Sequence, residues 1–123
     1  MGAEHLARGA AAERFAARAL EREGYRVLLR NHRTPEGEID LVAERRGVLA
    51  FVEVKAREQG GSAGTPDEAL TPAKLRRVAR AAEHVLRRRG LADAPRELLG
   101  AAVDVDARGT PTAVRFLRVE DVR

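Results

Sequence analysis

The stretch "GEIDLVAERRGVLAFVEVK", residues 37–55, decides the fold, because it predicts two apolar strands around a tight turn. We place the turn at Arg46-Gly47, where glycine supplies a positive φ. Strand alternation over 38–44 and 48–57 then gives one wholly apolar face, made of Ile39, Leu41, Ala43, Ala50, Val52 and Val54. A register shift of one residue would break this face, whereas a shift of two stays open. The hairpin therefore predicts the middle of a buried sheet.

The other face of this hairpin is charged beyond its turn end. There Val42 and Phe51 are followed by Glu38, Asp40, Glu53 and Lys55. In the predicted register Asp40 lies directly opposite Glu53, with Cβ atoms roughly 5 Å apart, and two carboxylates so placed repel each other. A bound cation would turn this repulsion into a binding site, and oxygen ligands favour Mg²⁺ or Mn²⁺ over zinc. The alternative is a solvated face with an incidental Glu38–Lys55 ion pair.

The flanking sequence predicts the order α-β-β-β-α-β-β. A helix over 3–23 ends at Gly24, and strands are expected at 25–30, 98–105 and 112–119. Thr71 and Pro72 begin a second helix, as N-cap and first helical residue, which reaches about residue 89. We expect one α/β domain over 1–123, with helices packed on a central sheet. The Gly-rich segment 58–70 is expected to be a flexible loop, which either closes over a substrate or merely connects.

The first helix carries one charged residue in its expected core-facing stripe. At 100° per residue, an arc of about 120° contains Leu6, Gly9, Ala10, Ala16, Ala17 and Leu20, and Glu13 lies within it. Phe15 falls outside this arc. A buried glutamate without a polar partner costs several kcal/mol, so we expect Glu13 to face the charged side of the hairpin. The alternative is a position near a sheet edge, where Glu13 reaches water.

The second helix has an apolar face and a basic one. Arg76, Arg80 and Arg87 lie opposite the apolar residues, and Lys74 borders them in the first turn. Phosphate contact would suit this arrangement, although a charged helix face is commonly just solvated. Lys74, Arg76 and Arg80 are therefore candidate substrate-binding residues.

Composition excludes several classes of protein. The 123 residues include no cysteine, which rules out a disulfide-stapled fold and thiolate metal sites. No apolar run is long enough to span a membrane and no signal peptide is evident, so we expect a soluble, cytoplasmic protein. The net charge of +4 permits an anionic partner without demanding one. One Tyr, three Phe and no Trp argue against a base-stacking surface.

The pattern Asp40, then Glu53-Val54-Lys55 on the next strand, resembles the PD-(D/E)xK nuclease superfamily. The fuller combination of "GEIDLV" with "FVEVKAR" resembles the YraN-type family of small bacterial proteins, which are related to archaeal Holliday-junction resolvases. The resemblance extends over most of the chain, from "GAAAERFAARALEREGYRVLLRNHRTPEGEIDLV" to Lys74. It implies a restriction-endonuclease-like mixed sheet flanked by helices.

The resemblance also implies a function: Mg²⁺- or Mn²⁺-dependent hydrolysis of DNA phosphodiesters, with double-stranded or branched DNA as the substrate. By position Asp40 and Glu53 would be metal ligands, Glu13 would support a ligand or a water, and Lys55 would position or activate the attacking water. One departure is that Ala102 stands where the family has an arginine in Arg-Phe-Asp, while Asp104 is kept. Arg96, six residues earlier, is a candidate to take the place of that arginine.

Two other functions stay open on the sequence. One is a nucleic-acid-binding module of nuclease ancestry with little or no catalysis, and the other is a scaffold whose sheet charges form ion pairs. A symmetric homodimer would suit cleavage of two strands.

Overall fold

The computed structural model describes residues 2–58 and 71–119. Their elements follow the predicted order: α1 (Gly2–Arg22), β1 (Arg26–Thr34), β2 (Gly37–Arg45), β3 (Val48–Glu58), α2 (Pro72–Arg88), β4 (Arg96–Val105) and β5 (Pro111–Val119). The main difference is β1, which runs to Thr34 because it pairs with β2 down to Gly37. Apart from Glu58, which ends β3, the expected loop at 58–70 lies outside the described residues.

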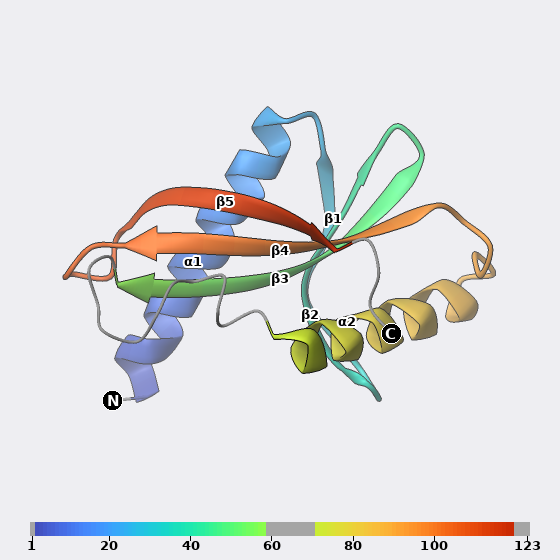
Figure 1. Cartoon of the computed structure of the whole chain (residues 1–123), viewed down its shortest axis with the longest axis horizontal. Coiled ribbons are helices and arrows are strands. Elements are labelled where there is room, and N and C mark those ends of the chain that lie inside the picture. The colour runs from blue at the N-terminus through green and yellow to red at the C-terminus, as the bar shows by residue number, and fades with distance from the viewer. Residues whose placement is uncertain (1, 59–70, 120–123) are drawn as a thin grey trace.

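The five strands form one mixed sheet in the order β1-β2-β3-β4-β5. Neighbours are antiparallel except β3 and β4, which are parallel and are linked through α2. The two helices lie on opposite faces of the sheet (Figure 1). This is the α/β architecture that the sequence predicted. No helix in the described ranges is both long and apolar enough to cross a membrane.

The central hairpin has the predicted register from its turn to Leu41, which pairs with Val52. Arg46 and Gly47 both have positive φ, 54° and 81°, as a two-residue hairpin turn requires. α1 covers the apolar face of this hairpin, so its core contains Leu41, Ala43, Ala50, Val52 and Val54. α2 covers the other face, where Val42 and Phe51 are buried.

Beyond Leu41 the two strands separate, and we refer to this opening as the fork. Here a side chain replaces a backbone acceptor: Oδ2 of Asp40 accepts a hydrogen bond from the backbone N–H of Val54 at 2.7 Å. On β1, Asn31 lies between the partners of Leu41 and Ile39 and has a φ of 50°. Alternation breaks here, and Ile39 joins the α2 side of the core. The predictions that Ile39 shares a face with Leu41 and that Asp40 directly opposes Glu53 were therefore wrong.

The core-facing side of α1 is rotated from the predicted arc. Ala12, Ala16, Ala17 and Leu20 are buried, and Phe15 packs against them. Gly9 and Ala10, predicted to face the core, are exposed. Burying part of one phenylalanine removes more apolar surface from water than burying glycine and alanine, so the helix turns toward Phe15.

The start of α2 is as predicted. The hydroxyl of Thr71 accepts a hydrogen bond from the N–H of Lys74 at 3.3 Å, and Pro72 opens the helix. Val78, Ala81, Ala82, Val85 and Leu86 anchor α2 on the sheet. This anchoring fixes which residues of the first two turns face the fork.

Candidate functional site

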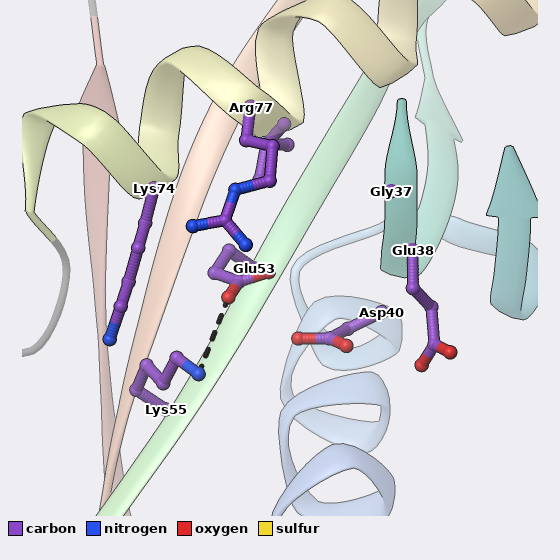
Figure 2. Close-up of a pocket in the computed structure, with 8 residues that line it drawn as sticks. Gly37, Glu38, Asp40, Glu53, Lys55, Lys74 and Arg77 are labelled. Atoms are coloured by element: carbon purple, nitrogen blue, oxygen red, sulfur yellow. Dashed lines mark ion pairs between the residues drawn. The ribbon is translucent and has the colours of Figure 1, made fainter. Parts of the chain in front are cut away.

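Charged side chains from β2, β3 and α2 line a cavity of about 210 Å³ beside the fork. The lining residues are Gly37, Glu38, Asp40, Glu53, Lys55, Lys74, Arg77 and Val78. Figure 2 shows Asp40 and Glu38 extending from β2, Glu53 and Lys55 from β3, and Lys74 and Arg77 from α2. A second cavity, of about 500 Å³, shares Asp40, Glu53 and Lys55 and adds Glu13 and Asn31. The sequence therefore predicted correctly that Glu13, Asp40, Glu53 and Lys55 lie around one place.

Asp40 is the most perturbed acid of this site. Its pKa is raised from 3.8 to about 7, first by burial and then by the negative charge of Glu53, while the Val54 N–H and Lys55 oppose the rise. Although the two carboxylates are not a ladder pair, the charge of Glu53 still acts on Asp40. Ionising Asp40 is therefore unfavourable at this position, mainly because the carboxylate is buried and also because Glu53 is nearby.

Glu53 and Lys55 form an ion pair on the same face of β3, with Lys55 Nζ 3.5 Å from Glu53 Oε1. The glutamate side chain is 13% exposed and the lysine 35%, so Lys55 is the more accessible of the two. The ammonium group therefore lies at the mouth of the site, next to the carboxylates. Lys55 pairs with Glu53 rather than with Glu38, which instead faces Arg33 at 3.8 Å.

Glu13 reaches the site from the opposite layer. α1 packs on the apolar face of the hairpin, not on its charged face as expected, and Glu13 approaches Asp40 at the fork. Burial and the charge of Asp40 raise the pKa of Glu13, while a hydrogen bond with the Asn31 side chain lowers it. Asn31, whose backbone marks the break in alternation, thus also holds this glutamate. Sequence reasoning did not single out Asn31.

The candidate substrate-binding residues are divided by the structure. Lys74 lines the cavity, as proposed. Arg80 does not; its Nε lies 3.6 Å from a carboxylate oxygen of Glu36. Arg76 is not among the lining residues either, and Arg77 takes the place expected for it. The spacing of three residues from Lys74 to Arg77, which puts both on one helical face, was the signal available in the sequence.

Ala102 on β4 stands where the family has an arginine, and the residue beside it on β5 is an arginine, Arg115. Ala102 is paired with Lys55 on one side and with Arg115 on the other, so Lys55, Ala102 and Arg115 form one row across three strands. Arg96 does not substitute, because it binds Glu83 at 2.7 Å and the carbonyl oxygens of Ala92 and Ala94.

The donor set suits a hard divalent cation. Among the described residues no three acidic or histidine side chains lie close enough to enclose an ion. Mg²⁺, however, is commonly held by one or two carboxylates together with waters. Asp40 and Glu53 supply those carboxylates, and burial together with the charge of Glu53 raises the pKa of Asp40, an effect that a nearby cation would oppose. These two residues fit such an ion, with Glu13 behind them.

Comparison with known proteins matches residues 12–117 to the model of "Uncharacterised protein family UPF0102". The chain belongs to the UPF0102 family. This family lies within the restriction-endonuclease-like superfamily, with which the strand order agrees. A UPF0102 protein of Thermus thermophilus is 44% identical over 109 residues, which is 89% of this chain and 90% of the relative. A UPF0102 protein of Symbiobacterium thermophilum is 54% identical over 82 residues, 67% of this chain and 69% of the relative.

A third UPF0102 relative, from Desulfosudis oleivorans, is 46% identical over 86 residues, covering 70% of this chain and 69% of its own length. None of these names states an activity. The family match spans α1 from Ala12 through most of β5, and therefore includes the whole fork.

Proposed function

We propose that this chain is a metal-dependent nuclease that hydrolyses phosphodiester bonds of DNA, with double-stranded or branched DNA as the substrate. The observation that carries the proposal is the joint lining of one cavity by Asp40, Glu53 and Lys55, at a fork where β2 and β3 separate. The raised pKa of Asp40 supports it, because a buried pair of carboxylates is unfavourable without a cation.

The residues divide the work by their positions. Asp40 and Glu53 would hold Mg²⁺ or Mn²⁺, which when bound polarises a phosphate and lowers the pKa of water. Lys55 lies at the accessible side of the pair, where its ammonium group can orient a water and offset charge on the phosphate. Glu13, held by Asn31 and adjacent to Asp40, would fix Asp40 or a water from the α1 side.

The test is a cleavage assay on duplex, forked and four-way DNA with Mg²⁺ or Mn²⁺. We expect cation-dependent cutting that Asp40→Asn and Glu53→Gln each reduce by roughly 100-fold or more. Asp93→Asn and Glu21→Gln are matched controls, since both carboxylates are exposed and neither lines the cavities. Cutting that survives both site substitutions would come from a contaminant and would refute the assignment.

A second candidate function is DNA binding without turnover. It is favoured because, among the described residues, no three acidic or histidine side chains lie close enough together to hold one metal ion. Calorimetric titration with Mn²⁺ separates the two candidates from a scaffold role. Binding that Asp40→Asn abolishes, without cutting of any substrate, would favour the second candidate; no Mn²⁺ binding by the unaltered protein would favour a scaffold.

A further inference from the structure

Within residues 2–58 and 71–119, two of the three cations that line the smaller cavity have no carboxylate partner. Lys55 is held by Glu53, but no ion pair joins Lys74 or Arg77 to a carboxylate within residues 2–58 and 71–119. Other arginines of α2 and β4 are engaged: Arg80 with Glu36, and Arg96 with Glu83. As far as the described residues go, Lys74 and Arg77 are therefore the cations of this cavity that can bind an anion from solution.

Arg77 is positioned by packing against bare backbone. Its Cδ and Cγ lie 3.6 and 3.7 Å from the point where a Cβ on Gly37 would stand. Gly37 has a φ of 137°, which residues with a side chain rarely adopt, so this surface stays open. The arginine stem lies along Gly37, and its guanidinium group points from α2 toward β3 and Glu53 (Figure 2).

The neighbouring residue fixes the direction of Arg77. Val78 is 4% exposed and packs in the core between α2 and the sheet, next to Ile39 and Phe51. This anchor sets the rotation of the helix, so that Lys74 and Arg77, three residues apart, face the cavity together. Arg80, one turn further on, lies toward Glu36 instead.

We propose that Arg77, with Lys74 beside it, binds a backbone phosphate of the DNA strand that enters the cavity next to Asp40 and Glu53. A planar guanidinium group binds two phosphate oxygens at once, and the lysine adds a point charge. The inference rests on the proposed function, because it assigns the strand-binding side of the same site. The sequence suggested Lys74, Arg76 and Arg80 as substrate-binding residues; the inference keeps Lys74 and replaces the two arginines with Arg77.

The test compares Arg77→Gln with Arg80→Gln, which removes an equal charge from the same helix. Both are made on an Asp40→Asn background in chelator, where no cutting occurs, and binding of a duplex and a four-way junction is followed by fluorescence anisotropy. We expect Arg77→Gln to weaken binding roughly five- to tenfold and to lower the salt dependence by about one phosphate contact. Arg80→Gln should stay within about twofold, and Arg77→Lys should recover part of the loss.

Equal weakening by Arg77→Gln and Arg80→Gln would overturn the inference, since the effect would then be that of the helix charge as a whole. So would unchanged binding, or no binding by the parent protein. In the cleavage assay, Arg77→Gln should raise KM more than it lowers kcat. Selective weakening of binding without cutting by the unaltered protein would refute the nuclease proposal and leave this inference standing. If the unaltered protein cuts DNA and Arg77→Gln leaves KM unchanged, the nuclease proposal would stand and this inference would be refuted.

Discussion

Replacing Asp40 with asparagine should stabilise the metal-free protein above neutral pH. The substitution removes the charge of a mostly buried carboxylate that burial and Glu53 hold at a pKa of about 7. It keeps the shape of the side chain, and the amide oxygen can still accept the hydrogen bond that Val54 N–H donates at 2.7 Å. The main change is therefore the loss of one unfavourable negative charge.

The sign and size follow from the pKa of Asp40, which is raised from 3.8 to about 7. Between these pH values the folded protein keeps a proton that the unfolded chain has lost. The stability from Asp40 is therefore complete below the lower value, declines as pH rises from there, and is lost once pH has passed the higher value. A rise of this size corresponds to roughly 4 kcal/mol at full ionisation, as an upper limit. We expect Asp40→Asn to gain on the order of 2–4 kcal/mol at pH 8.5 and only about 1 kcal/mol at pH 5, since little more than one pH unit separates pH 5 from the unfolded pKa of 3.8.

Thermal unfolding in chelator, followed by circular dichroism at pH 5 and pH 8.5, measures this difference. For a domain of this size the gain corresponds to a Tm increase of roughly 6–15 °C at pH 8.5. Asp93→Asn is the control, because its carboxylate is exposed. Asp40→Ala should be less stable than Asp40→Asn by about 1–3 kcal/mol, since it leaves the Val54 N–H without its acceptor.

A lower Tm for Asp40→Asn than for the unaltered protein at pH 8.5 would refute this reasoning. That result would mean that the ionised carboxylate is favourable even without a cation, so that the structure has no deficit of positive charge at the fork. A gain of equal size at pH 5 and pH 8.5 would also contradict it, since the effect would then be independent of ionisation.

Two further predictions concern the cation and the far end of the sheet. Because Asp40 must lose its proton to bind a metal, Mn²⁺ affinity in calorimetry should fall by up to tenfold for each pH unit below about 7, and a pH-independent affinity would exclude Asp40 as a ligand. Tyr25→Phe removes the hydroxyl that donates a hydrogen bond to Glu97, and should cost about 1–2 kcal/mol in urea unfolding. It should leave Mn²⁺ binding unchanged, since Tyr25 lines neither cavity of the site; a loss of Mn²⁺ binding would show that the two ends of the sheet are coupled.

The elements and the hairpin register could be predicted because local patterns determine them. Alternation from Leu41 to Val52, the turn at Arg46-Gly47 and the cap at Thr71 each involve residues close together in the chain. The break at Asp40 could not be predicted in the same way. It depends on Asn31, nine residues earlier on another strand, and on a carboxylate that replaces a backbone acceptor for Val54.

The sequence predicted which charged residues of the hairpin and of α1 gather at the site, but it predicted less well which face of each helix points toward it. Glu13, Asp40, Glu53 and Lys55 lie together as expected. The arc of α1 was misjudged because a projection counts residues equally, whereas the burial of Phe15 carries more free energy than that of Gly9 or Ala10. Arg77 was missed although it lies three residues from Lys74 on the same helical face, and its contact with Gly37 joins residues far apart in the chain.

The hydrogen bond from Val54 to Asp40 makes one backbone amide a natural probe of the site. Its donor lies between Glu53 and Lys55 in the chain, while its acceptor is the carboxylate that gains or loses a proton. The nitrogen and proton resonances of Val54 should therefore move with the charge on Asp40 and with any ion that draws this carboxylate away. The Val54 amide, between the cavity-lining residues Glu53 and Lys55 of β3, can therefore report by NMR whether an ion occupies the site.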